Sequence, residues 1–215
     1  MHDRSTRREF LTATGAVLSV ATAGCVTNDA SESITVEEDF ESELTGWETN
    51  AHVGPEADDS FEWSVERSQD EVRSGEWSLA IFTEGRFDDG TAWIVRPINV
   101  EPGRRYHVEA SIPAWSESES FNVVRHLVAY LGPEPPKTEE DFPEPGWNST
   151  DVEDAPVGGL REPLDLEDGW REYGFEWETP ELESDTLYFA VGNSVVWEAD
   201  RTHYVDDLEL TLRPE

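Results

Sequence analysis

The sequence predicts an all-β protein, a sandwich of about eight or nine antiparallel strands that follows a separate amino-terminal segment. Apolar residues recur at every second position in short runs along the chain, the pattern of strands with one face in a core. Gly, Pro, Asp and Ser separate these runs, as turn residues do. No segment of comparable length carries apolar residues at helical spacing.

The composition indicates that the chain folds in spite of its charge. Its 215 residues include Asp+Glu 49 against Lys+Arg 15, a formal net charge of -34, but also 9 Trp, 9 Phe and 5 Tyr. So many aromatic residues are untypical of a disordered acidic tail. Lys137 is the only lysine and the acids are spread along the whole length, a composition that resembles that of proteins from extreme halophiles. Such a surface repels nucleic acid, so we expect no nucleic-acid partner.

The amino terminus has the order of an export signal. Arg7 and Arg8 precede an apolar stretch, 11–24, that is too short to span a bilayer. "STRREFL" resembles the twin-arginine (Tat) signal motif, and "TAGC" resembles the lipobox of secreted lipoproteins, although Thr22 stands where that box usually has leucine. The resemblance implies a cleaved Tat signal peptide over 1–24, followed by a lipid on Cys25.

Cys25 is the only cysteine, which excludes an intrachain disulfide and a thiolate zinc cluster. Residues 25–33 read as a polar tether and 34–215 as the folded domain. The expected location is the cell surface, where the lipidated cysteine would anchor the protein to the outer face of the cytoplasmic membrane.

The strands of the domain are expected where the alternation is clearest. Each run places its apolar residues on one face and its polar residues on the other. The runs are Phe61–Val65, Trp77–Ile81, Tyr106–Ile112, Tyr173–Trp177, Leu187–Val191 and Leu208–Leu212. A further strand is expected over Phe121–Leu131, where the alternation is imperfect because Arg125 and His126 interrupt both parities. Within them Trp63, Trp77 and Trp177 are expected in the core.

Residues 132–164 interrupt this rhythm with prolines and acids, and predict a long surface loop that is not a central strand. The tripeptide "NST" at Asn148 matches an N-glycosylation acceptor on such a loop.

Several segments of the domain resemble carbohydrate-binding modules with a galactose-binding-like jelly roll, of the family 4/9/22-like kind. They are "DFESELTGWE", "VRSGEWSLAI", "INVEPGRRYHVEASIPAW", "GWREYGFEWETP" and "HYVDDLELTL", which occur in that order between Asp39 and Leu212. The resemblance implies a jelly-roll sandwich and a carbohydrate or other envelope polymer as partner.

Modules of this group often hold a structural calcium ion where the first and last strands meet. By the same resemblance, Asp39 or Glu41 and Asp206 or Asp207 would supply the oxygen ligands. The alternative is that these are solvated acids among many.

Sugar rings stack on aromatic side chains, so aromatic residues at the ends of strands are the candidate binding residues. Trp115, Trp147 and Trp197 occupy such positions, and Arg125 interrupts an apolar strand as a polar candidate. The alternative for each tryptophan is a lid over the core.

Catalysis is not expected, because the chain has no GxSxG elbow, P-loop, GxGxxG or metal-binding histidine spacing. The sequence therefore predicts a lipid-anchored, non-catalytic surface protein that recognises glycan. Two alternatives stay open: a polysaccharide hydrolase or lyase on the same fold, and a structural or protein-interaction domain of the envelope.

Overall fold

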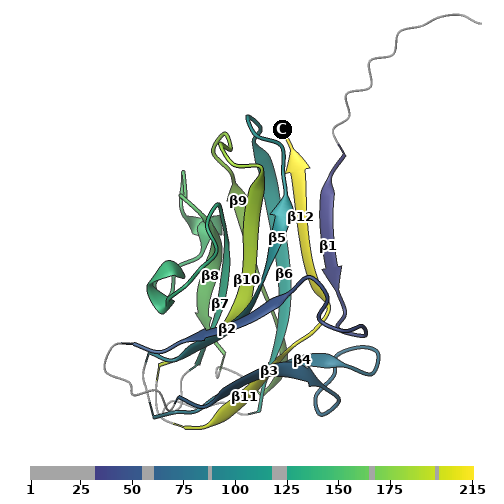
Figure 1. Cartoon of the computed structure of the whole chain (residues 1–215), viewed down its shortest axis with the longest axis vertical. Coiled ribbons are helices and arrows are strands. Elements are labelled where there is room, and N and C mark those ends of the chain that lie inside the picture. The colour runs from purple at the N-terminus through teal and green to yellow at the C-terminus, as the bar shows by residue number, and fades with distance from the viewer. Residues whose placement is uncertain (1–31, 55–60, 87–88, 118–124, 165–167, 197–198) are drawn as a thin grey trace, which may run out of the picture. The chain divides into compact units, whose positions relative to one another are not determined.

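The computed structural model describes residues 32–54, 61–86, 89–117, 125–164, 168–196 and 199–215. These residues form twelve antiparallel strands and two short 3₁₀ turns, and the strands belong to two sheets, here named sheet A and sheet B (Figure 1). The protein is the β-sandwich that the alternating runs predict.

Sheet A has seven strands. Its central strand, β6, pairs with β9 along one edge and with β12 and then β11 along the other. β1 pairs with the outer edge of β12, whereas β4 and then β3 follow β11. The strands are β1 (Ile34–Glu38), β3 (Trp63–Ser68), β4 (Ser78–Thr83), β6 (Tyr106–Ser116), β9 (Gly169–Glu178), β11 (Arg201–Val205) and β12 (Leu208–Pro214).

Sheet B has five strands in the order β2-β5-β10-β7-β8. Its central strand β10 and the neighbouring β5 and β7 are buried at both parities over most of their length, which is typical of strands covered on both faces. The strands are β2 (Glu48–His52), β5 (Thr91–Asn99), β7 (Arg125–Gly132), β8 (Gly158–Pro163) and β10 (Thr186–Val195).

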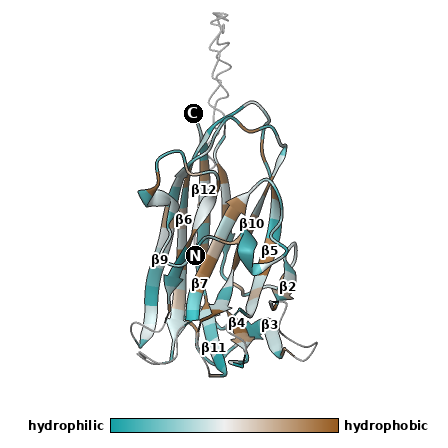
Figure 2. Cartoon of the chain, turned by 90° about the vertical axis from the view of Figure 1, so that its left-hand side faces the viewer, coloured by the Kyte–Doolittle hydropathy of each residue, from teal (hydrophilic) through white to brown (hydrophobic). Residues whose placement is uncertain are grey.

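The main core lies between the two sheets and is built from alternate residues of each strand. Leu187, Phe189 and Val191 of β10 are all 0% exposed and pack in one cluster with Val108 and Ile112 of β6. In Figure 2, brown segments lie on β7 and β10 of sheet B and teal segments on β9 of sheet A. The burial of this core stabilises the sandwich, since each large apolar side chain contributes roughly 1.5–3 kcal/mol when it is fully buried.

The structure has more strands than the eight or nine expected, for two reasons. Short strands such as β2 (Glu48–His52) have no alternating apolar residues. They form because a neighbouring strand, here β5, pairs with them. The predicted loop is also shorter than 132–164, because Gly158–Pro163 forms β8 at the edge of sheet B. Pro163 ends that edge strand, where a missing amide donor is tolerated.

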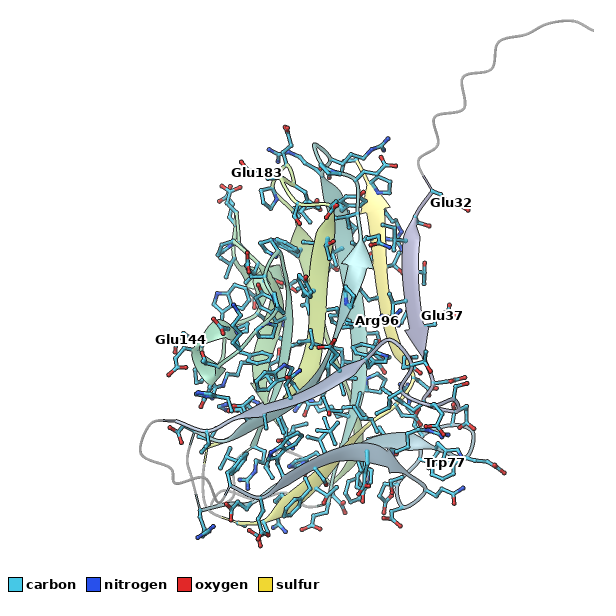
Figure 3. The ribbon with its side chains drawn as sticks, viewed as in Figure 1. Glu32, Glu37, Trp77, Arg96, Glu144 and Glu183 are labelled. Carbon is cyan, nitrogen blue, oxygen red and sulfur yellow. The ribbon has the colours of Figure 1, made fainter. Side chains whose placement is uncertain are left out.

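Of the three tryptophans predicted in the core, only Trp177 lies there. Trp177 is buried as expected and its indole Nε1 donates to the carbonyl oxygen of Ala155 at 2.8 Å. Trp63 is instead 39% exposed. Trp77 is half-buried, and the guanidinium of Arg67 lies 4.3 Å from the centre of its ring, at the sheet A edge visible in Figure 3.

Candidate functional site

Sheet B has an outer face, turned away from the main core, on which a second apolar cluster forms. Along β5 the inward residues Ala92 and Ile94 belong to the main core, so Trp93 and Val95 between them face outward. The cluster on this face contains Trp93, Val95, Val128, Tyr130, Phe142 and Ala190.

Phe142 reaches this face from the long loop between β7 and β8. Its ring lies 5.3 Å from that of Trp93 at 74° and 6.4 Å from that of Tyr130 at 73°, both edge-to-face contacts. Trp93 is consequently only 1% exposed. The loop therefore closes over the outer face of sheet B.

Among the residues that the structure describes, three polar atoms on this face are buried and have no hydrogen-bond partner: Nε1 of Trp93, Oγ1 of Thr91 and Nδ1 of His52. His52 is paired directly with Thr91 across β2 and β5, and Trp93 is two residues further along the same face. Leaving one such atom unpaired costs roughly 1–3 kcal/mol, so native proteins rarely do it. A water molecule or a polar ligand could supply the bonds that these three atoms lack.

A polar network continues from these atoms across the sheet. Arg161 on β8 donates from Nε to Nδ1 of His126 at 3.3 Å and from Nη2 to Oγ of Ser194 at 2.9 Å. It also forms an ion pair with Glu139, which comes from the closing loop. Ser194 donates to the same Glu139 oxygen at 3.2 Å. The network thus joins the sheet to the loop.

His126 is neutral at ordinary pH. Burial lowers its pKa to about 4, and the charge of Arg161 acts in the same direction. A neutral imidazole can accept a hydrogen bond at Nδ1, which agrees with the hydrogen bond that Nε of Arg161 donates there.

Gly192 lies where a larger residue would clash with its neighbours. Gly192 of β10 lies between Trp93 and Val128 in the register of the sheet. A Cβ there would lie 2.5 Å from Cβ of Trp93 and 2.2 Å from the carbonyl oxygen of Ala92. Only glycine therefore leaves room for the indole at this position.

A second surface, here named the sheet A groove, lies on the other side of the sandwich. The rings of Trp115 on β6 and Tyr204 on β11 are 5.4 Å apart at 80°, and Trp170 on β9 pairs with Trp115 from the opposite side. The groove has a volume of about 380 Å³ and is lined by Asp70, Glu71, Phe82, Trp115, Glu117, Asp200, Arg201, Thr202 and Tyr204. One of its buried polar atoms, Nε of Arg201, has no hydrogen-bond partner.

The structure separates the predicted ligand residues. Trp115 lines the sheet A groove, but Trp147 is half-buried in the long loop, packs against the main core and bonds to β8 through its backbone. Trp197 lies outside the described residues. The predicted tryptophans thus do not share one surface among the residues that the structure describes.

Arg125 is 0% exposed and points between the sheets, opposite to its neighbour His126. Its Nε donates to Oγ1 of Thr83 at 3.3 Å, and Nη2 donates to the carbonyl oxygen of Ala199. It lies near His203, whose pKa is lowered to about 3, first by burial and second by this arginine. Arg125 therefore belongs to an interior polar cluster and lines neither of the two surfaces.

The acids expected at a calcium site have partners within the chain. Asp206 is 0% exposed, and its Oδ2 accepts the backbone amides of Arg73 at 2.8 Å and Ser74 at 3.1 Å. Its Oδ1 accepts the amide of Asp207 at 2.8 Å. Backbone amides therefore provide the partners of this buried carboxylate.

Asp39 and Glu41 flank the buried Phe40. Glu41 accepts two amides of the β3–β4 connection, at 2.6 and 2.9 Å, while Arg67 donates to the carbonyl oxygens of Phe40 at 2.6 Å and Glu41 at 2.8 Å. Asp39 and Asp207 line one acidic groove. Within the described ranges, no group of three or more His, Cys, Asp or Glu side chains lies close enough to hold a metal ion. The structural calcium stays a prediction.

Asn148 is half-buried, and the nitrogen that a glycan would modify is already engaged. Its Nδ2 donates to Glu162 Oε1 at 2.9 Å and to the carbonyl oxygen of Gly174 at 3.0 Å, while Oδ1 accepts the amide of Thr150 at 3.0 Å. Glycosylation here would have to break both donor bonds.

The predicted export and lipid residues, Arg7, Arg8 and Cys25, lie outside the described part of the chain. None of the described residues belongs to a helix with the length and apolar character that crossing a bilayer requires.

The missed site residues are Trp93, Thr91, His52 and Arg161. A signal existed in "TAWIV", where apolar residues occupy both parities and therefore indicate a strand covered on both faces. The register that brings β2 and β8 to the same face is a property of the tertiary structure and is not visible in that stretch.

No protein-family model matches the chain, and no curated protein sequence matches it. Solved structures with a similar fold include part of an arabinose-bound α-L-arabinofuranosidase, with a TM-score of 0.50, 12% identity and coverage of 82% of this chain and 24% of that chain. A structure of carbohydrate-binding modules of the β-sandwich superfamily has a TM-score of 0.48 and 19% identity, and the match covers 80% of this chain and 60% of that one. The CBM22-1 xylan-binding domain of Paenibacillus barcinonensis Xyn10C has a TM-score of 0.45 and 12% identity, and the match covers 83% of this chain and 93% of that chain.

The chain spans 60% of the β-sandwich module structure and about a quarter of the arabinofuranosidase.

Proposed function

We propose that this protein binds glycan, without catalysis, on the outer face of sheet B. One observation carries the proposal: three buried polar atoms without partners, on Trp93, Thr91 and His52, lie together on that face. The sheet A groove has one such atom.

A sugar could supply the hydrogen-bond partners that the three buried atoms of this face lack. The indole N–H of Trp93 is a donor, and the Thr91 hydroxyl and the His52 ring nitrogen can donate or accept. Sugar hydroxyl groups do both, and each bond would remove the cost of a buried unpaired atom. The ring faces of Trp93 and Tyr130 supply the apolar surface on which the C–H face of a sugar packs.

The loop must move for a glycan to bind, because Phe142 covers Trp93. The loop contributes Glu139 and Phe142 to the closed face, so binding exchanges these two contacts for contacts with the ligand. Such an exchange lowers the observed affinity by the free energy needed to open the loop.

The test is isothermal titration of the purified protein against a panel of neutral and acidic oligosaccharides at molar salt. The expected result is binding to at least one of them, weakened about tenfold in Trp93→Phe, which keeps a ring but removes Nε1, and in Thr91→Val. The proposal fails if no oligosaccharide binds, or if both variants bind as the parent does. Ligand-stimulated release of reducing ends would contradict the non-catalytic part.

We also propose that the protein is exported by Tat and held at the outer face of the cytoplasmic membrane by a lipid on Cys25. The support is the order of the signal: twin arginines, a short apolar stretch, then the single cysteine.

The anchor is tested by Cys25→Ser in the native host. We expect the variant to be lost from the membrane fraction, because the residue that would carry the lipid is gone, while its glycan binding stays that of the parent. Membrane retention of Cys25→Ser would contradict the lipid anchor and leave the binding site unaffected.

A further inference from the structure

The charge of Arg161 is balanced by the loop and not by the sheet. Arg161 is 7% exposed, and its one ion pair among the described residues is with Glu139. Its other side-chain partners, His126 and Ser194, are neutral groups of sheet B. When the loop opens, the arginine therefore loses the only carboxylate that pairs with it in this part of the chain.

A buried cation without a counter-charge is strongly unfavourable. A neutral glycan that displaces the loop would leave the Arg161 guanidinium in that state. A ligand with its own carboxylate would restore the ion pair, and the same oxygen could accept from Ser194 as Glu139 now does.

The loop presents two groups to the face, a carboxylate from Glu139 and a six-membered ring from Phe142. The carboxylate lies on Arg161 and Ser194, and the ring lies against Trp93. A hexuronic acid carries the same two features in one residue, a carboxylate on a six-membered ring with an apolar face.

We propose that the glycan recognised on the outer face of sheet B contains hexuronic acid, whose carboxylate replaces that of Glu139 on Arg161. This inference rests on the proposed function of that face. The loop then acts as an internal competitor that occupies the site with similar chemistry until the ligand displaces it.

The charge of the whole molecule opposes this ligand at low salt. A net charge of -34 repels a polyanion at long range, whereas molar salt reduces the Debye length to about 3 Å and leaves the contact with Arg161. We therefore expect affinity for the acidic glycan to rise between low and molar salt.

The test compares each acid with its own methyl ester, which differs by the loss of charge. The probes are oligomers of galacturonate, glucuronate and alginate, titrated into the purified full-length protein at molar salt. At least one acid is expected to bind about tenfold or more tightly than its ester, a difference of about 1.4 kcal/mol or more.

Two variants locate the effect. Arg161→Gln should remove the preference for acid over ester, and Glu139→Gln should strengthen binding of the acid because the competing carboxylate is gone. Arg213→Gln is the control: it removes the same charge from an exposed pair with Glu109 on sheet A and should leave the preference unchanged.

The outcomes separate this inference from the proposed function. Trp93-dependent binding of neutral glycans, with esters equal to acids, would overturn the hexuronate inference and leave the proposed function standing. A preference that persists in Arg161→Gln would also overturn it. Failure of every acid, ester and neutral oligosaccharide to bind would overturn both.

Discussion

Two buried histidines illustrate how single residues set the response of this protein to acid. The pKa of His126 is lowered to about 4 and that of His203 to about 3, in both cases first by burial and then by a neighbouring arginine. Both side chains are almost inaccessible to solvent. In the unfolded chain each would take up a proton near pH 6.5.

The free energy of unfolding should therefore fall as the pH falls below about 6.5. The unfolded state binds protons in this range and the folded state does not, so each histidine contributes up to about 1.4 kcal/mol per pH unit, and the loss stops near the folded pKa. His107 has the opposite sign, since Glu178 and then Glu109 raise its pKa against burial, but its exposed position makes its effect small.

Urea unfolding at molar salt between pH 7 and pH 5 measures this slope. His126→Asn and His203→Asn should each flatten it, and His107→Gln should not. A slope that does not change in either buried-histidine variant would show that these residues take up protons in the folded state.

Among the elements, the last two strands, β11 and β12, are separated by Asp206 and Asp207. The carboxylate of Asp206 accepts three backbone amides, two from the connection before β4 and one from Asp207, whose φ is +48°. These bonds hold the β3–β4 connection to the junction of β11 and β12. Glu209, three residues further, is exposed and pairs in β12.

Asp206→Ala should lower the free energy of unfolding by about 3 kcal/mol, because it leaves buried amides without an acceptor. Glu209→Ala, which removes an exposed carboxylate from the nearby β12, should change the free energy of unfolding by less than about 0.5 kcal/mol. Denaturant titration of both variants provides the measurement. Equal effects would mean that the amides find other acceptors.

The loop between β7 and β8 is the element that controls access to sheet B. Phe142→Ala should expose Trp93, whose ring it covers, and so increase quenching of tryptophan fluorescence by acrylamide. Val152→Ala, an exposed position of the same loop, is the control. Unchanged quenching in Phe142→Ala would mean that other groups keep Trp93 covered.

The labelled Glu144 of this loop extends away from the strands in Figure 3.

The sequence predicts some of these elements well and others poorly, for physical reasons. β6 and β10 are predicted because one face of each is apolar and the other is polar or small. β8 is missed because its glycines and Pro163 resemble a loop, and it becomes a strand only by pairing with β7. The local sequence pattern indicates which face of a strand is buried, whereas a short edge strand forms only when a partner strand pairs with it.

At the scale of the whole molecule, the candidate site could not be predicted because it is made by register. His52, Trp93 and Arg161 are far apart in sequence and meet on one face only through the order β2-β5-β10-β7-β8. Trp115 was predictable from its place at a strand end, and it does line a groove. That groove belongs to the other sheet.

The two sheets therefore offer two surfaces with different chemistry. The outer face of sheet B is closed by Phe142 and holds three unpaired polar atoms, and the sheet A groove is lined by Trp115 and Tyr204 among carboxylates. We propose that glycan binds the outer face of sheet B.

Calorimetric titration of the best-binding oligosaccharide into Trp93→Ala and Trp115→Ala distinguishes the two surfaces. Each variant removes one tryptophan, so the pair differs in which sheet it alters, and circular dichroism confirms that both are folded. Binding is expected to be lost in Trp93→Ala and kept within about twofold in Trp115→Ala. Loss in Trp115→Ala with normal binding in Trp93→Ala would contradict the account and place the site in the sheet A groove.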